Sequence, residues 1–226
     1  MDVGGNLQLL KERIVRAALR AGRNPQDITL VAVTKTVSAE ITRQVYDCGI
    51  KSLGESRVQE LQKKYNLLPL DTVWHMIGHL QTNKIKYIID KVALIHSIDR
   101  MALADEISRQ ALLQGLTVQV LVEVNISGEA SKFGIPLCEA LEFVKAVNCL
   151  PGLTVRGLMT MAPYTESPEE ARSVFRELKE LSKRINNESI EKNMELLSMG
   201  MSNDFEVAVE EGANIVRIGS AIFDGI

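Results

Sequence analysis

The chain has 226 residues, of which 46% are hydrophobic and 24% are charged, so its composition is that of an ordinary folded protein and excludes a disordered chain. The formal net charge of −3 provides no basic field for nucleic acid as the main partner. The three cysteines, Cys48, Cys138 and Cys149, show no CxxC or metal-like spacing, which favours a reducing compartment such as the cytoplasm.

The N-terminal segment has the pattern of an amphipathic helix. Leu7, Leu10, Ile14 and Ala18 recur at helical spacing among charged residues. No apolar run elsewhere approaches the ~20 residues that a membrane-spanning helix needs. We therefore expect a soluble protein with no membrane partner.

Short β-branched apolar runs then alternate with longer segments of helical periodicity, which is typical of parallel β–α units. Eight such runs are predicted to be strands: Thr29–Thr34, Ile50–Leu53, Val73–Ile77, Ala93–Ser97, Thr117–Val124, Thr154–Leu158, Glu195–Ser198 and Asn214–Ile218. Eight parallel units in a chain of this length predict an α/β fold with a closed (β/α)8 barrel. Because no linker divides the chain, we expect residues 1–226 to form one domain.

The clearest helix between the predicted strands is expected over Pro168–Asn186. Ser167 and Glu170 have the spacing of a capping box, and Pro168 takes the first helical position. The apolar positions of this segment form one stripe that would cover the outside of the barrel: Ala171, Val174, Phe175, Leu178, Leu181 and Ile185.

Functional groups of such a barrel lie where the carboxyl ends of the strands meet the following loops. Polar and glycine-rich clusters follow the predicted strands and are expected to converge on one rim: Lys35, Gly54–Ser56, Gly78, Ser97, Asp99, Asn125, Ser198–Ser202 and Gly219–Ser220.

Lys35 directly follows the apolar run 30–34, and the barrel interior is expected to desolvate its amine in part. Burial lowers the pKa of a lysine and so raises the fraction of neutral amine, which is the form that attacks an aldehyde. The alternative is a lysine that extends from the strand end into solvent, and for this residue considered alone that alternative is favoured.

Two strand–turn segments near the C-terminus are candidates for a phosphate site. Ser198–Ser202 and Gly219–Ser220 follow the seventh and eighth predicted strands, where barrels frequently bind phosphate. Backbone N–H groups at such turns, with a helix dipole behind them, suit an anion. The alternative is that these glycines only permit tight turns.

Arg217 lies inside the last predicted strand and would be buried in the barrel, so it requires a ligand or a carboxylate partner. Three carboxylates are candidate partners: Glu55, Asp99 and Glu123. The three histidines lack the spacing of a metal site, and a packing role is predicted for each: His75, His79 and His96.

Taken together, these segments resemble the pyridoxal phosphate homeostasis protein family, which is related to the N-terminal barrel of alanine racemase. The resemblance extends over almost the whole chain. The matching segments, in order, are VAVTK at 31–35, GES and VQE at 54–60, WHMIGHLQTNK at 74–84, SID at 97–99, VEVNIS at 122–127 with Lys132 and Gly134 beyond it, RGLMTM at 156–161, LSMGMSND at 197–204 and VRIGSAIF at 216–223.

The resemblance implies a single (β/α)8 barrel of the alanine racemase N-terminal type (PLP fold type III) with an extra N-terminal helix, and pyridoxal 5′-phosphate (PLP) as the cofactor. It assigns the Schiff base to Lys35 and assigns the phosphate to Ser202, Gly219 and Ser220. It also implies pocket-shaping roles for Ser198, Met199 and Gly200. Arg217 would face the pyridine nitrogen, where a cation disfavours protonation and weakens the ring as an electron sink.

At two neighbouring positions this chain departs from the family pattern. The family usually has asparagine and tyrosine where this chain has Ser56 and Arg57. Because serine is shorter than asparagine, the resemblance does not assign Ser56 a hydrogen bond to the cofactor.

The implied function is that of a cytoplasmic PLP-binding protein that acts in intracellular PLP homeostasis, as a carrier or buffer without a clear apparatus for turnover. Its partners would be PLP and PLP-dependent apo-enzymes, and we expect a monomer. The alternative is a PLP-dependent amino-acid racemase, which needs acid–base groups on both faces of the substrate. Lys35 could serve one face, but only Tyr164 is expected near the rim, and no second domain is expected after the barrel. A Schiff-base aldolase acting on a sugar phosphate is a third class, which the whole-chain resemblance disfavours.

Overall fold

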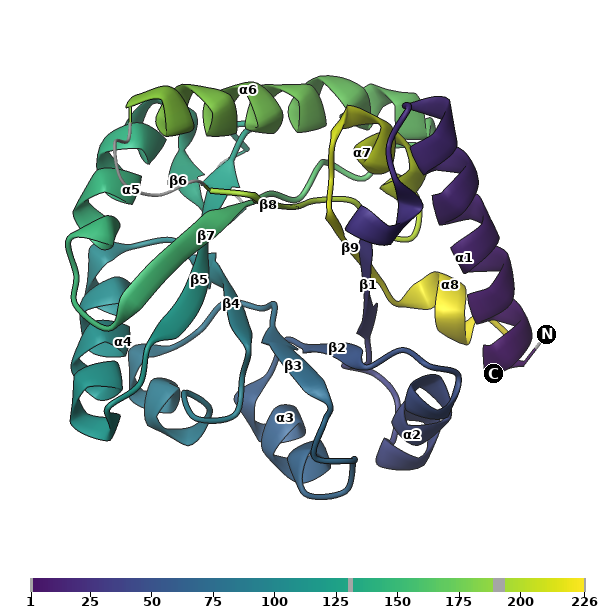
Figure 1. The fold of residues 1–226 in the computed structure, drawn as a ribbon, viewed down its shortest axis with the longest axis horizontal. Helices are drawn as coiled ribbons and strands as arrows, with labels where there is room; N and C mark the ends of the chain where they lie inside the picture. The colour runs from purple at the N-terminus through teal and green to yellow at the C-terminus, as the bar shows by residue number, and fades with distance from the viewer. Residues whose placement is uncertain (1, 130–131, 189–193, 226) are drawn as a thin grey trace.

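Eight parallel strands close into a barrel in the computed structural model, which describes residues 2–129, 132–188 and 194–225 (Figure 1). The strands of the barrel are β1 (Thr29–Val33), β2 (Ser52–Glu55), β3 (Val73–Met76), β4 (Leu94–Ile98), β5 (Val118–Asn125), β7 (Leu153–Met159), β8 (Leu196–Ser198) and β9 (Ile215–Ile218). Each strand pairs in parallel with the next one in this order, and β9 pairs with β1, so the ring is closed. The predicted (β/α)8 barrel is confirmed.

Helices cover the outside of this barrel (Figure 1). They are α1 (Val3–Arg20), α2 (Ala39–Asp47), α3 (Val58–Tyr65), α4 (Met101–Gln114), α5 (Ala140–Asn148), α6 (Arg172–Glu188), α7 (Phe205–Glu211) and α8 (Ser220–Phe223), with 3-10 helices η1 (Pro25–Asp27), η2 (Thr82–Tyr87), η3 (Leu137–Glu139) and η4 (Pro168–Ala171). A short strand, β6 (Ile135–Pro136), adds to the carboxyl end of β5. Within the described ranges, none of the helices has the length and apolar character needed to span a bilayer.

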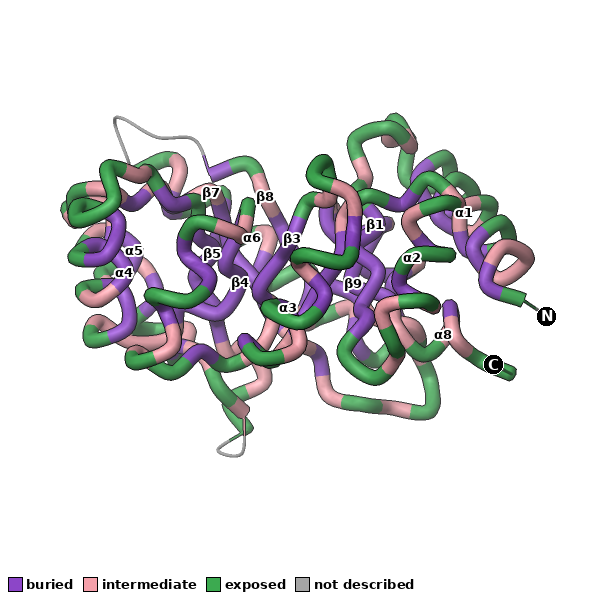
Figure 2. The backbone as a smooth tube through the Cα atoms, turned by 90° about the horizontal axis from the view of Figure 1, so that it is seen from below, coloured by how far each residue is buried: buried purple, intermediate pink, exposed green. Residues whose placement is uncertain are grey.

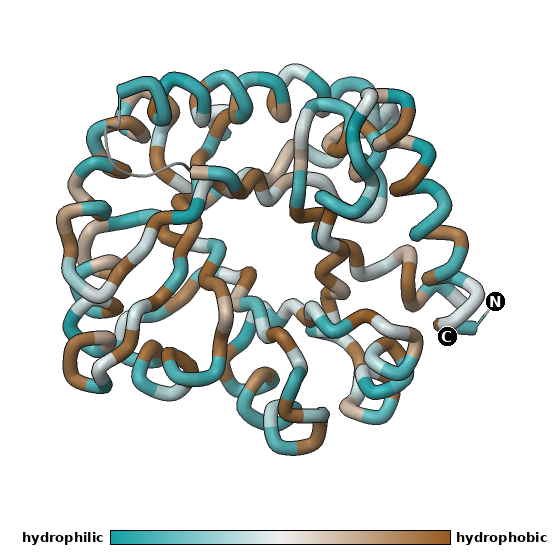
Figure 3. Tube along the Cα trace, in the orientation of Figure 1, coloured by the Kyte–Doolittle hydropathy of each residue, from teal (hydrophilic) through white to brown (hydrophobic). Residues whose placement is uncertain are grey.

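The apolar side chains point between the barrel and the helices. Figure 2 shows buried residues along the strands and on parts of the helices, and Figure 3 shows hydrophobic residues around the inner ring of strands and at intervals along the helices. Parallel strands covered by helices are buried on both faces, which explains why β1 appears in the sequence as an uninterrupted apolar run.

α1 precedes the first strand and packs on the outside of the barrel against α2, α7 and α8. The predicted apolar positions are buried: Leu7, Leu10, Ile14 and Ala18. Arg20 forms ion pairs with Glu206 (2.9 Å) and Glu210 (2.7 Å) of α7 across this contact. Because Arg20 is half exposed, we attribute the attachment of α1 mainly to its buried apolar stripe.

β2 lies further along the chain than the predicted strand Ile50–Leu53. Ile50 is buried, but its backbone N–H donates back to Val45 at the end of α2 (3.3 Å). The pairing with β3 instead includes Ser52–Glu55. Gly54 and Glu55 have low strand propensity, and only the neighbouring strands place them in the sheet.

The helix predicted over Pro168–Asn186 is present in two parts, η4 and α6. The predicted capping box is wrong, because the side chain of Ser167 makes no capping hydrogen bond. The carbonyl of Ser167 accepts the N–H of Glu170 (3.1 Å), so a 3-10 turn satisfies that donor with a backbone acceptor. The apolar stripe is confirmed: Ala171, Phe175, Leu178, Leu181 and Ile185 are buried, and Val174 is partly buried.

Candidate functional site

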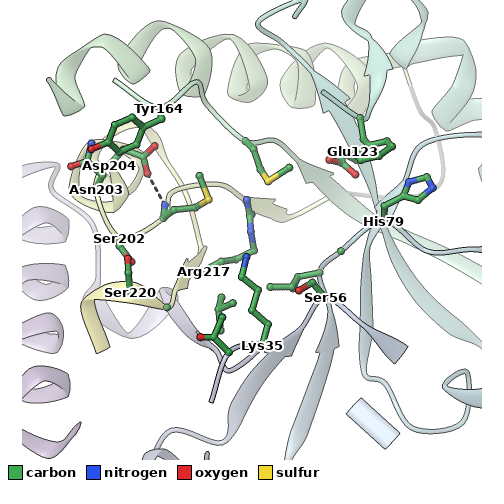
Figure 4. A pocket seen from close by; sticks show the side chains of 18 of the residues that line it. Lys35, Ser56, His79, Glu123, Tyr164, Ser202, Asn203, Asp204, Arg217 and Ser220 are labelled. Atoms are coloured by element: carbon green, nitrogen blue, oxygen red, sulfur yellow. Dashed lines mark hydrogen bonds between the residues drawn. The ribbon is translucent and has the colours of Figure 1, made fainter. Parts of the chain in front are cut away.

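A cavity of about 580 Å³ opens at the carboxyl ends of the barrel strands (Figure 4). Its volume lies in the range of small-molecule sites. Among its lining residues are five that the sequence predicts for the site: Lys35, Ser202, Arg217, Gly219 and Ser220. Ser56, at the position where the chain departs from the resembled family, also lines the cavity.

Lys35 lies in the turn after β1, at the mouth of the cavity. Figure 4 shows its side chain extending into the pocket toward Arg217. The residue is exposed, so the expected partial desolvation of its amine is not found. The physical reason is its place in the chain: Thr34 is the last fully buried residue, and the backbone leaves the barrel directly after it.

A buried ion pair holds the backbone next to Lys35. Nζ of Lys64, on α3, donates to Oε1 of Glu55 (2.7 Å) and to the carbonyl of Thr34 (2.6 Å). The hydroxyl of Thr34 donates to the same Glu55 oxygen at 2.6 Å. Glu55 and Lys64 are 0% and 3% exposed, so their charges compensate each other away from water. The pair therefore ties α3 and β2 to the residue from which the Lys35 turn begins.

Ser202 and Ser220 lie close together on another side of the cavity (Figure 4). Ser202 Oγ accepts the N–H of Ala221 at 3.2 Å, which joins the loop after β8 to the start of α8. Among the described residues, the backbone N–H groups of Ser202, Gly219 and Ser220 donate no hydrogen bond to protein. The two hydroxyls and three N–H groups form a donor-rich wall that suits an anion.

Ser198, Met199 and Gly200 are not among the lining residues of the cavity; they are buried at the end of β8 and directly after it. The carbonyl of Gly200 accepts the N–H of Arg217 at 3.0 Å. Gly200 has a φ of 94°, and a Cβ there would lie 2.6 Å from that of Ala208. Glycine therefore permits both the left-handed backbone and the close approach of α7. Ser198 and Gly200 thus bond to Arg217 from outside the cavity lining, and the pocket-shaping role expected of the three residues stays a prediction.

Arg217 crosses the floor of the cavity and is 4% exposed. Its guanidinium donates to Ser198 Oγ (2.6 Å) and to the carbonyl of Thr160 (3.0 Å). It forms no ion pair, within the described residues, with any of the carboxylates proposed from the sequence, and Glu55 is paired with Lys64. Burial lowers the pKa of Arg217 to about 10, against the attraction of Glu123 and Asp204, so the group stays charged at neutral pH.

A chain of hydrogen bonds continues from Arg217 through the barrel interior. Ser198 Oγ, which accepts from Arg217, also shares a hydrogen bond with Nδ1 of His96 (2.9 Å). Nε2 of His96 and Nδ1 of His75 share the next hydrogen bond (2.9 Å). Both imidazoles are neutral, because burial lowers the pKa of His75 to about 4 and that of His96 well below its usual value. The two buried histidines thus help to orient the Ser198 hydroxyl that holds Arg217.

Comparison with known proteins identifies the family. The family described as "Alanine racemase, N-terminal domain" matches residues 6–225. A pyridoxal phosphate homeostasis protein of Aquifex aeolicus is 48% identical over 226 residues, which cover 99% of this chain and 98% of that protein. The chain belongs to the pyridoxal phosphate homeostasis protein family. The family resemblance predicted from the sequence is confirmed.

Solved structures extend the family relationship to three dimensions. A protein from Bifidobacterium adolescentis, described as unknown, has a TM-score of 0.92 and 34% identity, covering 98% of this chain and 94% of its own. PipY of Synechococcus elongatus, solved with PLP bound, has a TM-score of 0.86 and 29% identity, covering 98% of this chain and 100% of its own. Both share the barrel over nearly the full length of both chains.

The sequence does not predict every residue that lines the cavity of this member of the pyridoxal phosphate homeostasis protein family. For His79 the sequence predicts only packing, but it lines the cavity, pairs with Asp99 (3.0 Å) and stacks on Phe133. Its position three residues after the end of β3 is the signal that could have identified it. Phe133 lies in a loop with no periodic pattern. Tyr164 lines the rim, as expected.

Acid is expected to destabilise the fold through His75. The unfolded chain binds a proton at this residue near pH 6.5, whereas the folded chain does so only near pH 4. The contribution of His75 to the free energy of unfolding is thus fully present above about pH 6.5 and is lost as the pH falls toward 4. The stability difference between wild type and His75→Gln should therefore shrink by about 2 kcal/mol between pH 7.5 and pH 5. Urea unfolding at both pH values measures it, and parallel pH profiles would contradict it.

Proposed function

We propose that this chain binds pyridoxal 5′-phosphate as a Schiff base on Lys35 and acts in intracellular PLP homeostasis. The observation that carries the proposal is the single cavity shared by the amine of Lys35 and the hydroxyls of Ser202 and Ser220 (Figure 4). PLP has an aldehyde, which a primary amine binds covalently, and a phosphate, which hydroxyl and N–H donors bind. The names of the curated relatives and the PLP bound to PipY support the same ligand.

The residues present fit this cofactor. The donor-rich wall of Ser202, Gly219 and Ser220 would hold the phosphate, and Ser198, Met199 and Gly200 would support that wall from behind. When bound, PLP supplies an electron sink for carbanion chemistry. Arg217 would lie against the pyridine nitrogen, with its guanidinium held by two hydrogen bonds and charged at neutral pH. A cation there disfavours protonation of the nitrogen, so these residues favour holding the cofactor over carbanion chemistry.

We further infer that the chain acts as a monomer in the cytoplasm and that PLP-dependent apo-enzymes are its recipients. The free thiols of Cys48, Cys138 and Cys149 support a reducing compartment. The exposure of Lys35 supports a role in release, because an incoming amine can reach the lysine from solvent.

A PLP-dependent amino-acid racemase is the second candidate, and one observation favours it: the phenol of Tyr164 lines the same cavity. A racemase needs a second proton-transfer group held in a fixed position opposite the lysine. Tyr164 is 88% exposed, and no hydrogen bond holds its phenol among the described residues. We therefore favour the carrier.

The purified protein is expected to take up PLP with a visible absorbance, and borohydride should fix the cofactor to the peptide that contains Lys35. A colourless protein that traps a substrate ketone would instead identify an aldolase. The α-proton of L- or D-alanine in deuterated water should exchange no faster with the PLP-loaded protein than with free PLP. Fast exchange with both enantiomers would identify a racemase.

A further inference from the structure

Glu123 places a carboxylate in the wall of the cavity, at the end of β5. The residue is 3% exposed and lines the cavity. Figure 4 shows it beside His79 and on the other side of the pocket from Ser202 and Ser220. It is therefore separate from the wall to which we assign the phosphate.

The carboxylate of Glu123 makes no hydrogen bond and no ion pair with any residue in the part of the chain that the structure describes. Arg217 attracts it without coming within ion-pair distance, and Asp99 repels it. Burial, followed by Asp99, raises the pKa of Glu123 to about 7, so this carboxyl group ionises near neutral pH inside the protein. A buried ionisable group that lacks a partner destabilises the folded chain unless a ligand compensates its charge.

Glu55 provides the comparison within the same barrel. It is as deeply buried as Glu123, but Lys64 neutralises it at 2.7 Å and Thr34 donates to it at 2.6 Å. A structural role thus accounts for the burial of Glu55. No equivalent cation or donor meets Glu123 from the described protein residues, and because Glu123 lines the cavity, a ligand in the cavity can reach its carboxylate.

The side chains around Glu123 indicate what else that partner contains. His79 and Phe133 stack with their ring centroids 4.2 Å apart and their planes at 22°. Both line the cavity, as does Met161, and Phe133 is 54% exposed. An anionic carboxylate next to an aromatic and apolar surface suits a ligand with a protonated amino group and an apolar body.

We propose that Glu123 anchors the protonated amino group of a second small ligand, an amine with an apolar body, which enters the cavity beside the cofactor. The biological meaning of this subsite rests on the proposed function, because amines are the compounds that displace a lysine from a Schiff base. The subsite itself is a property of Glu123, His79 and Phe133, and its occupancy can be measured with or without PLP.

The test uses N,N-dimethylbenzylamine, a cationic probe that as a tertiary amine forms no Schiff base, and benzyl alcohol, a neutral probe of similar size. Their Kd values are measured by calorimetry at pH 8, with PLP-loaded and PLP-free protein. We expect wild type to bind the cation at least about tenfold more tightly than the alcohol, because the ammonium group can donate a charge-assisted hydrogen bond to Glu123. Glu123→Gln should abolish this preference and leave the binding of the alcohol unchanged.

Glu129→Gln is the matched control, because it removes an exposed carboxylate from the segment that follows β5. It should keep the preference for the cation. Equal affinity of wild type and Glu123→Gln for the cation would overturn the subsite, whereas PLP absorbance in both proteins would leave the cofactor assignment intact. Conversely, a preference for the cation that depends on Glu123 in a protein that takes up no PLP would support the subsite and contradict the proposed function.

Discussion

Lys35→Ala is expected to lose all covalent attachment of PLP and to retain only weak binding. The amine is the group that would bond to the aldehyde, while Ser202, Gly219 and Ser220 would still hold the phosphate. The Kd for PLP should rise by more than about tenfold, which corresponds to at least 1.4 kcal/mol. Two measurements report the covalent attachment of PLP. The visible Schiff-base absorbance should be lost, and the mass spectrum should show no cofactor fixed by borohydride.

Lys35→Arg is the matched control for this substitution, because it keeps a cation at the mouth of the cavity but provides no amine for a Schiff base. It should also lack the covalent adduct. Adding Ser202→Ala and Ser220→Ala to Lys35→Ala should weaken the residual binding by about tenfold per lost hydrogen bond, as titration with PLP would show. Equal cofactor retention in Lys35→Ala and wild type would contradict the assignment.

Lys64→Met is expected to lower the free energy of unfolding by about 3–5 kcal/mol, because it leaves the buried carboxylate of Glu55 without its cation. The methionine also cannot donate to the carbonyl of Thr34, the residue before Lys35. PLP binding should therefore weaken even in molecules that remain folded. Urea unfolding measures the first effect, and PLP titration below the unfolding transition measures the second.

Lys63→Met is the control on the same helix. Lys63 is 69% exposed and pairs with Glu60 only on the surface, so its loss should change stability by less than about 0.5 kcal/mol. Combining Lys64→Met with Glu55→Gln removes both charges and should recover a large part of the lost stability. Similar effects of Lys63→Met and Lys64→Met would show that the buried pair does not fix the end of β1.

The strands that sequence reasoning places well are those with continuous apolar runs. β1 and β5 are largely buried on both faces between the barrel interior and the helices, so β1 is apolar from Leu30 to Val33, and the central residues 120–122 of β5 are apolar as well. β2 has no such run: Ser52, Gly54 and Glu55 belong to it because β1 and β3 offer them hydrogen-bond partners. Its position could not be predicted from local propensity.

For the candidate site, the sequence predicts where the side chains lie in the fold better than it predicts which groups they bond to. Lys35, Ser202 and Ser220 follow strands, and the carboxyl ends of parallel strands meet at one rim, so their convergence on one cavity could be expected. The inward direction of Arg217 follows from the alternation of side chains along a strand. Its expected carboxylate partner is absent among the described residues, because Ser198 and the backbone of Thr160 take up its N–H groups.

The sequence by itself determined that this chain folds as a barrel of parallel strands with an amine on one strand end and donor-rich turns on two others. The order and period of apolar residues are sufficient for that, because they specify which faces are buried. Only the tertiary structure decided that Glu55 is neutralised by Lys64, whereas Glu123 meets no partner among the residues that the structure describes. Charge compensation acts over a few ångströms between residues from different strands and helices, and the closure of the ring sets which of them meet.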